Sequence, residues 1–468
     1  MEIIIILLAL GFLMFVAYRG FSVILFAPIC ALFAVLLTNP GHVLPFYSGI
    51  FMENMVGFVK LYFPVFLLGA IFGKVIEMSG FAKSITRAII GIVGAQRAML
   101  AIVLVGATLT YGGVSLFVVA FAVYPFAAEL FRAANIPKRL IPGTIALGAF
   151  TFTMDAFPGT PQIQNIIPTT FFKTNTWAAP WLGLIGGLFV FIIGMTYLEW
   201  RRRTALKAGE GYGEGHIQEP DPLASDEALA NPYLAIAPLV LVGVLNKVFI
   251  KTLPLHYGTS FNFASTGIAA VAKVAPVSVD KLVGIWAVEG ALLCGILLVL
   301  ACSISRVRKN FNVKINASIA GSLLATINTA SEYGFGAVIA SLPGFAAVKD
   351  HIGATFTNPL VNEAVTTTTL AGVTGSASGG MSIALAAMGQ TYLEQAQKFG
   401  IDPQVLHRVA AMASGGMDTL PHNGAVITLL TITGLTHKQS YKDIFFLTCI
   451  KTVACFFVIG VYSVFGIV

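Results

Sequence analysis

The sequence predicts an all-α polytopic membrane protein that is built from two inverted-topology repeats. The first observation is compositional: 57% of the 468 residues are hydrophobic, 10% are charged and the mean hydropathy is +0.85, whereas soluble domains carry roughly 25% charged residues. The second is that residues 263 positions apart recur in three separate segments. We expect each repeat to hold five spans, one re-entrant hairpin and a broken helix.

A span needs roughly 20 apolar residues, and the hydropathy profile predicts spans along the whole chain, several of them interrupted by glycine, proline or polar residues. The first apolar run ends in Tyr18-Arg19-Gly20 without a small-residue cleavage site, so it is expected to be a span and not a signal peptide. The spans lie near 3–18, 20–38, 58–80, 140–173, 177–200, 232–250, 281–303, 315–345, 405–435 and 443–467.

Two further apolar stretches, about 98–133 and about 359–395, are interrupted near their middles by small residues. The interruptions are Tyr111-Gly112-Gly113 and the run from Thr374 to Gly380. We interpret both stretches as re-entrant hairpins. If each stretch instead crossed the membrane twice, the topology of the rest of the chain would be the same.

The basic residues give the orientation, because cytoplasmic loops carry an excess of Lys and Arg. Their distribution predicts that both termini face the periplasm and that the protein lies in a bacterial inner membrane. The residues assigned to the cytoplasm are Arg19, Lys83, Arg87, Arg97, Arg132, Lys138, Arg139, Arg201 to Arg203, Lys207, Arg306, Arg308, Lys309, Lys314, Lys438 and Lys442. Those assigned to the outside are Lys60, Lys173, Lys247, Lys251, Lys273, Lys281, Lys349, Lys398 and Arg408.

The hydrophilic segment 201–231 divides the chain into a first repeat, 1–200, and a second repeat, 232–468. It is rich in glycine, proline and charge, which is typical of a solvated cytosolic linker. We expect His216 and the acids of this segment to be surface residues without a special role.

The internal repeat has one offset throughout. Phe72, Gly73, Val75, Ile76, Gly112, Ser115, Met154, Asp155 and Pro158 recur as Phe335, Gly336, Val338, Ile339, Gly375, Ser378, Met417, Asp418 and Pro421. Five spans are an odd number, so the second copy is expected upside down, as in secondary transporters that bind substrate at the repeat interface. Spans 3–80 and 232–345 would then be scaffold, and 98–173 with 359–435 the moving unit.

Proline and glycine interrupt the spans at about 140–173 and about 405–435, within the matching runs Met154–Pro161 and Met417–Gly424. Unwound backbone at membrane depth survives beside a cavity or buried in protein, and free N–H groups at helix N-termini favour an anion. The hairpin tips would add hydroxyls from opposite sides and enclose a carboxylate without an arginine. The candidate substrate-binding residues are Thr110, Gly112, Gly113, Ser115, Gly159, Thr160, Gly375, Ser376, Ser378, Thr419, His422 and Asn423.

Acids inside spans are costly unless paired or hydrated, and they are candidates for carrying a proton. The proton-coupling candidates are Asp155, Asp418, His422 and Glu332. For each aspartate the alternative is a structural cap that ties the broken helix to its neighbour, and for Glu332 it is hydrogen bonding to Asn328 or Thr329. Glu363 is expected near a span end or in a protein-facing pair.

Several function classes are excluded or disfavoured. The chain has no His-Glu-x-x-His motif and no Gly-x-Ser-x-Gly elbow, so we do not expect an enzyme. No basic stripe interleaved with aromatics points to nucleic acid. The five cysteines lie in apolar runs without metal-ligand spacing, so neither a metal nor another cofactor is expected.

The run Asp418-Thr419-Leu420-Pro421-His422-Asn423-Gly424-Ala425-Val426, followed by 434–443, resembles the gluconate permease (GntP) family of the ion transporter superfamily. The similarity extends over the whole chain and is closest to a branch labelled β-hydroxybutyrate permeases. The Ser-His-Val-Asn-Asp-Ser-Gly run expected of gluconate-specific members is absent. The resemblance implies proton symport of a short hydroxy-monocarboxylate such as 3-hydroxybutyrate, with a homodimer by analogy.

Two alternatives stay open on the sequence. One is symport of gluconate or another sugar acid with a proton. The other is a sodium-coupled carboxylate transporter, because Thr374, Ser376 and Ser378 are oxygen ligands of the kind that a hard cation prefers. A small organic anion, a co-transported ion and the lipid bilayer are thus the expected partners.

Overall fold

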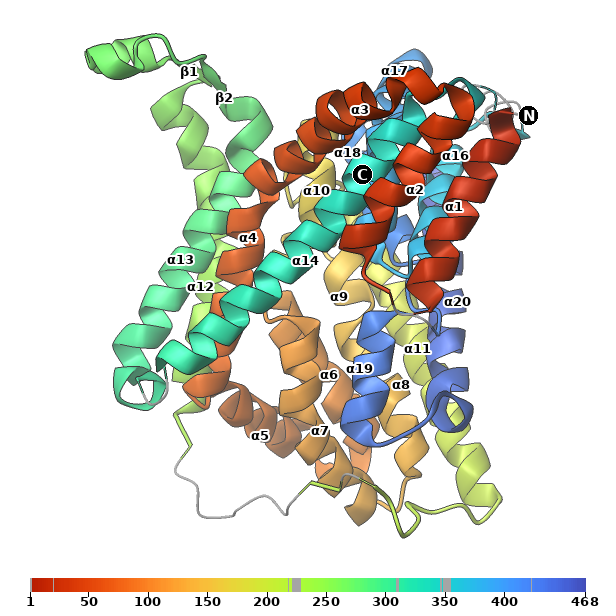
Figure 1. The fold of residues 1–468 in the computed structure, drawn as a ribbon. Coiled ribbons are helices and arrows are strands. Elements are labelled where there is room, and N and C mark those ends of the chain that lie inside the picture. Colours follow the sequence, from red (N-terminus) through yellow and green to blue (C-terminus); the bar gives the residue numbers. More distant parts are fainter. Residues whose placement is uncertain are drawn as a thin grey trace.

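The computed structural model describes residues 2–19, 21–217, 219–220, 229–308, 311–345, 347, 355–421 and 423–468. Its described part is a bundle of helices with one two-stranded antiparallel ribbon, β1 (Ser260–Phe261) and β2 (Val277–Ser278), so the all-α architecture is confirmed. Figure 1 shows the N-terminus at the upper end and the C-terminal end of α11 at the lower end.

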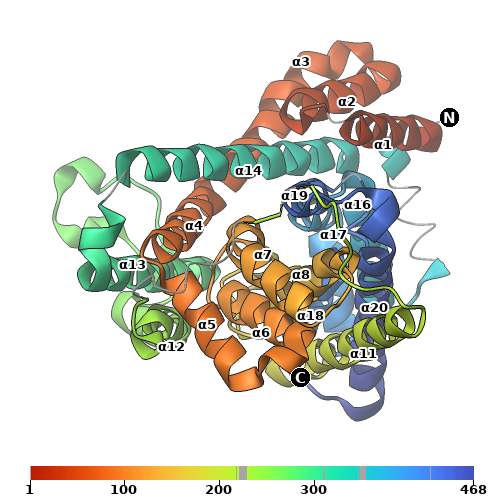
Figure 2. The same ribbon diagram turned by 90° about the horizontal axis from the view of Figure 1, so that it is seen from below.

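A wall of helices supports the rest of the molecule. α4 and α14 pack on each other and form its centre (Figure 2). α2 packs on α14 and is followed by α1, and α13 packs on α4 and is followed by α12. The third span begins earlier than the sequence indicates, because a continuous helical stretch runs from Pro40 to Met78 and not from about 58. The helices are α1 (Glu2–Tyr18), α2 (Val23–Thr38), α3 (Val43–Phe46), α4 (Glu53–Met78), α12 (Pro232–Tyr257), α13 (Val279–Val307) and α14 (Phe311–Ala340).

The other helices lie on one side of this wall (Figure 2). Two helix pairs are hairpins with sharp turns, α6–α7 and α16–α17, and two helical paths are interrupted, α8–α9–α10 and α18–α19. The bounds are α5 (Phe81–Val93), α6 (Ala98–Tyr111), α7 (Leu116–Ala133), α8 (Ile141–Ala149), α9 (Phe152–Asp155), α10 (Ile163–Phe172), α11 (Pro180–Lys207), α16 (Pro359–Thr374), α17 (Ala377–Phe399), α18 (Pro403–Ser414), α19 (Gly424–Thr433) and α20 (His437–Phe465).

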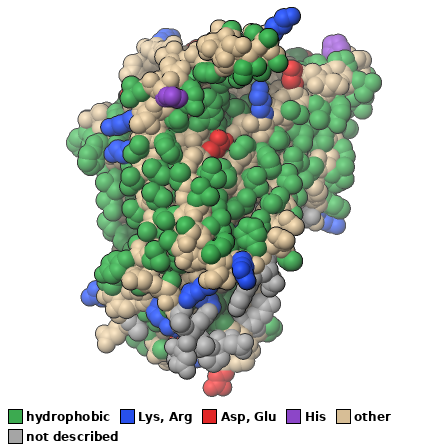
Figure 3. Space-filling view, turned by 90° about the vertical axis from the view of Figure 1, so that its left-hand side faces the viewer, with side chains coloured by type: hydrophobic (Ala, Val, Ile, Leu, Met, Phe, Trp, Pro, Cys, Tyr) green, Lys and Arg blue, Asp and Glu red, His purple; other side chains and the backbone are tan. Residues whose placement is uncertain are grey.

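The outer surface fits a bilayer. Within the described residues, five helical stretches are long and apolar enough to cross a membrane, among them α11 and α20. On α11, Trp181 and Trp200 are exposed near opposite ends, and 19 residues of helix span about 28 Å, close to the roughly 30 Å of a hydrocarbon core. Hydrophobic side chains cover the middle of the face in Figure 3, and most Lys and Arg side chains visible there lie toward its two ends.

The first part of the segment between the halves is packed and not simply solvated. Glu210 accepts hydrogen bonds from Arg139 at 2.6 and 2.7 Å, and these bonds lower the pKa of the Glu210 carboxyl. Glu219 pairs with Lys138 at 2.8 Å and with Arg132. Glu210 and Glu219 are therefore structural partners of basic residues at the end of α7 and just before α8, and not acids without a role, as the sequence led us to expect.

Close backbone packing inside the α16–α17 hairpin generates the first prediction. A Cβ atom at Gly380 would overlap the backbone of Ala371 and lie 2.5 Å from the carbonyl carbon of Leu370. Overpacking of this kind costs about 1–3 kcal/mol. Gly380→Ala should lower the thermal unfolding midpoint of the purified protein in detergent. Gly243→Ala, at a helix glycine with nothing within 4 Å of an added Cβ, should leave the midpoint unchanged or raise it slightly; equal midpoints for the two variants would contradict the packing argument.

Candidate functional site

The first helical path breaks after Asp155, the last residue of α9, and resumes at Ile163 in α10. Between them Gly159 has φ of +81°, which glycine adopts without strain. Its N–H donates to Thr176 O at 2.8 Å, and an added Cβ would lie 2.5 Å from the Trp177 ring. Gly159 is thus held against the loop before α11.

The second path breaks after Ser414, the last residue of α18, and resumes at Gly424 in α19. Asn423 closes this break: its Oδ1 accepts from Val426 N at 2.9 Å, and its Nδ2 donates to Gly375 O at 2.7 Å. The Asn423 side chain therefore caps the N-terminus of α19. His422, a candidate for both substrate binding and proton coupling, lies outside the described residues.

Each hairpin tip touches the break of its own half. In the first half Gln162 Nε2 donates to Thr110 O at 2.7 Å, and the Tyr111 hydroxyl donates to Pro158 O at 2.8 Å. The bond from Asn423 to Gly375 O is the equivalent contact in the second half. The tips are thereby fixed to the unwound segments.

The remaining tip residues face several neighbours. Gly112 lies against Leu239 of α12, Gly113 against Pro161, and the backbone N of Ser115 against Gly73 of α4. In the second tip, Ser376 Oγ accepts from Gly379 N at 3.1 Å and lies 3.5 Å from Ser378 Oγ. The glycines of the first tip thus permit close packing against neighbouring helices, and they do not line one common substrate-binding site.

Buried polar atoms gather at the first break. The hydroxyls of Thr110 and Thr160 and the Oε1 atom of Gln164 are buried, and no hydrogen bond reaches them within the described part of the chain. Because buried polar groups are normally hydrogen-bonded, these atoms are available to a bound solute or water. Thr419, by contrast, bonds through its hydroxyl to Thr448 and through its carbonyl to the Tyr441 hydroxyl at 3.1 Å. Both partners belong to α20, so Thr419 fixes the second break to that helix.

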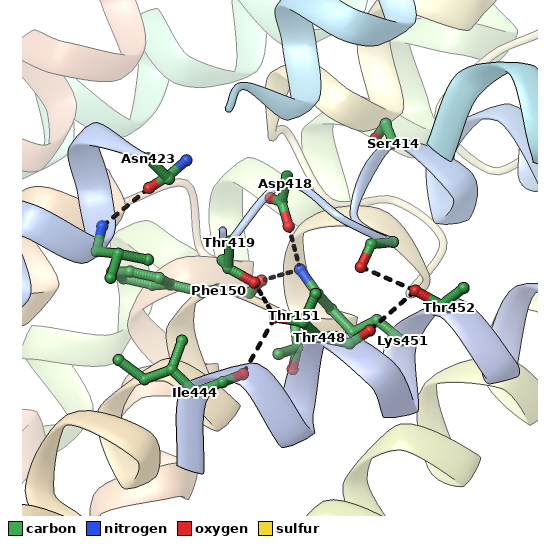
Figure 4. Close-up of polar contacts among 12 residues, drawn as sticks. Phe150, Thr151, Ser414, Asp418, Thr419, Asn423, Ile444, Thr448, Lys451 and Thr452 are labelled. Atoms are coloured by element: carbon green, nitrogen blue, oxygen red, sulfur yellow. Dashed lines mark hydrogen bonds and ion pairs between the residues drawn. The ribbon is translucent and has the colours of Figure 1, made fainter. Parts of the chain in front are cut away.

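A charged cluster lies between the two broken paths (Figure 4). Lys451, from the middle of α20, donates to Asp418 Oδ1 at 2.6 Å and to Phe150 O at 3.2 Å. Asp155 lies beside it: an added Cβ on Gly415 would overlap Asp155 Oδ2 and lie 3.4 Å from Lys451 Nζ. Asp155 is 4% exposed and Lys451 3%. One ammonium therefore stands close to two carboxylates.

Arg408 ties the halves together. It is fully buried on α18 and donates to Asp155 O at 3.2 Å, Asn165 Oδ1 at 3.1 Å and Ala178 O at 2.7 Å. The Asn165 Oδ1 atom also accepts a hydrogen bond from His407 Nε2 at 3.1 Å. The sequence assignment of Arg408 to the outside is wrong, because its guanidinium is used internally to satisfy unwound backbone of the first half.

Two further buried acids are not satisfied by neighbours. Glu332 on α14 is 3% exposed, and no described group bonds its Oε2 atom, so neither Asn328 nor Thr329 fulfils the role considered for them. Glu363 on α16 is fully buried with both carboxyl oxygens unpartnered among the described residues. Of the two expectations for Glu363, the protein-facing pair is absent among the described residues, whereas the position near a helix end is met, because Glu363 is the fifth residue of α16.

Lys451 is not among the site residues that the sequence predicts. Its signal was a lone lysine near the centre of a long apolar span, because intramembrane ionisable residues mark functional sites. The structure brings Asp155 and Asp418 together around this lysine, and it places Thr110 and Thr160 at the first break. Glu332 lies apart, against the second hairpin tip.

Among the comparisons with known proteins, the relative of high sequence identity is a transporter. No model of a known protein family matches the sequence. The "Uncharacterized transporter YxjC" of Bacillus subtilis (strain 168) is 62% identical over 475 residues, which cover all of both chains. Among solved structures, the chain is similar to the YdaH transporter of Alcanivorax borkumensis, with 16% identity, a TM-score of 0.49, and coverage of 92% of this chain and 90% of that one. The identity over the full length shows that the chain belongs to the family of the B. subtilis transporter YxjC.

Proposed function

We propose that the protein is a secondary active transporter that imports a small hydroxy-monocarboxylate, such as 3-hydroxybutyrate, together with a proton. The observation that carries this proposal is the cluster of Asp155, Asp418 and Lys451 between the two helix breaks. Lys451 forms its ion pair with Asp418, and Arg408 donates to the backbone carbonyl of Asp155 and not to its side chain, so the Asp155 carboxylate has no ion-pair partner among the described residues. A buried uncompensated charge is costly, and a bound proton would remove it.

The first break supports an organic anion as the substrate. The unpartnered hydroxyls of Thr110 and Thr160 can donate to a carboxylate, and no side chain caps the N-terminus of α10. A helix N-terminus favours negative charge. The resemblance of the second break to the β-hydroxybutyrate branch of the gluconate permease family adds the preference for a short hydroxy acid.

Alternating access follows from an inverted repeat, which we propose on the order of the helices. The series α6, α7, α8, α9 and α10 recurs, 263 positions later, as α16, α17, α18, a short turn and α19. In this proposal the hairpins and broken helices move against the wall of α4 and α14. A homodimer, held through the wall, completes the arrangement.

The transport test uses purified protein in liposomes and labelled 3-hydroxybutyrate, with an imposed inward proton gradient and no sodium. Accumulation above equilibrium that a protonophore abolishes is the expected result. Gluconate, lactate and citrate serve as competitors and rank the acids. Accumulation only in the presence of sodium would overturn proton coupling and favour the sodium alternative; no accumulation with either ion would overturn the substrate class.

The charge cluster predicts which variants lose transport. Asp418→Asn and Lys451→Gln should each reduce gradient-driven accumulation at least ~5-fold, the lower bound for a coupling free energy between two sites. Asp280→Asn and Lys281→Gln change exposed residues of the same types at the start of α13, and they should transport normally. Wild-type accumulation by both cluster variants would remove the cluster from the mechanism.

The same cluster predicts non-additive stability. Removing one partner of a buried ion pair leaves an uncompensated charge and costs about 3–5 kcal/mol. Thermal unfolding in detergent should show that Asp418→Asn combined with Lys451→Gln is less destabilising than the two single changes added together. The expected interaction free energy is about 0.5–3 kcal/mol, whereas strict additivity would mean that the pair contributes nothing.

A further inference from the structure

The contact between Glu332 and Gly379 joins the wall to the second hairpin. The Glu332 carboxyl on α14 occupies the space that a Cβ atom of Gly379 on α17 would fill. One turn further along both helices, a Cβ on Gly336 would lie 2.8 Å from the Ile383 Cα atom. The two helices therefore approach as closely as their backbones allow, and Glu332 is enclosed between them.

No opposite charge enters this contact from the described elements that pack on α14. Glu53 and Lys60 of α4 are exposed, Lys74 pairs with Glu77 at the other end of α4, and Glu394 and Lys398 lie near the far end of α17. On α14 itself, Lys314 is exposed in the first turn, far along the helix from Glu332. The remaining titratable side chains of these elements are neutral thiols and phenols: Cys30, Tyr47, Tyr62, Tyr333 and Tyr392. An ionised Glu332 would thus be a buried charge without a partner, which costs several kcal/mol.

The first half has a different register between wall and hairpin. At the matching position, Gly73 of α4 lies against Ser115, which corresponds to Ser378, whereas Gly336 lies against Ile383. This difference of five residues amounts to about 7.5 Å along a helix. Gly69, which matches Glu332, has nothing within 4 Å of an added Cβ. The second hairpin is tightly docked on its wall helix in a register that the first hairpin does not share.

We propose that Glu332 is a second proton-binding site, which permits the docked register of α14 and α17 only while its carboxyl is protonated. When the hairpin shifts to the register seen in the first half, Glu332 comes level with Thr374 at the hairpin tip, where hydroxyls and water can solvate its ionised form. Proton loss then favours the shifted register. This inference deepens the proposed function and rests on it for what the proton drives, but the contact itself needs no substrate.

The test measures a disulfide across the contact. Thr329 Oγ1 and Ser378 Oγ are 3.4 Å apart, so Thr329→Cys with Ser378→Cys, in a background without the five native cysteines, should form a disulfide in the docked register. The rate is compared with that of the same pair carrying Glu332→Gln, which stays neutral at every pH. The Glu332 protein should match the Gln variant at about pH 5.5 and fall about fivefold below it at about pH 8.5. A ratio that does not change with pH would falsify the proposal.

Two controls make each outcome informative. Ser318→Cys with Ala70→Cys joins α14 to α4, where the Ser318 hydroxyl bonds Ala70 O at 2.9 Å, and it reports the pH dependence of thiol oxidation with Glu332 in place, even if the Gln variant does not fold. Glu289→Gln removes another acid, on α13, and should leave the pH dependence of the hairpin disulfide unchanged. The crosslinking assay uses neither a proton gradient nor a solute. Failed uptake of 3-hydroxybutyrate together with pH-dependent crosslinking would therefore refute only the proposed substrate. Normal uptake together with a crosslinking ratio that does not change with pH would refute only the proton-binding role of Glu332.

Discussion

The ammonium of Lys451 is the interaction on which the centre of the molecule depends. It reaches from α20 to Asp418 in the second break and to the carbonyl of Phe150 at the end of α8. Without a cation at this depth, two carboxylates and an unwound helix end would face each other in a low-dielectric interior, where unpaired polar groups are costly. The lysine therefore stabilises both interruptions at once. Arg408 likewise is a buried cation that satisfies unwound backbone, because it donates to the carbonyls of Asp155 and Ala178.

Much of the fold could be predicted because apolar runs and helix-breaking residues mark where the helices begin and end. Apolar runs of span length mark the long helices, and Gly112, Gly113 and the run from Thr374 to Gly380 lie where the helices of the two hairpins turn. Pro158, Gly159 and Pro161 likewise occupy the first interruption, because proline and glycine cannot continue a helix at low cost. The third span starts earlier than its hydropathy indicates because Pro40 stands at the first position of the helical stretch, where proline is tolerated.

The partners of the buried charges could not be predicted in the same way. Arg408 follows a short loop and was counted among loop charges, but an amphipathic turn of α18 directs it inward to Asn165. Lys451 and Asp418 are 33 positions apart, and Asp155 is farther still, so no local pattern announces their meeting. Such contacts depend on how α20 packs between the halves, which is a tertiary property. The enclosure of Glu332 likewise depends on a glycine in another helix.

The unequal docking of the two hairpins has an energetic consequence. Two halves with the same order of helices do not make the two orientations of a carrier equal in free energy, because only one half places a carboxyl in the wall contact. A carrier that rests mainly in one orientation binds its solute from the disfavoured side with an apparent affinity reduced by the small fraction of molecules that are open there. Dissociation constants determined from the two faces of one membrane should therefore differ even when the binding residues are the same.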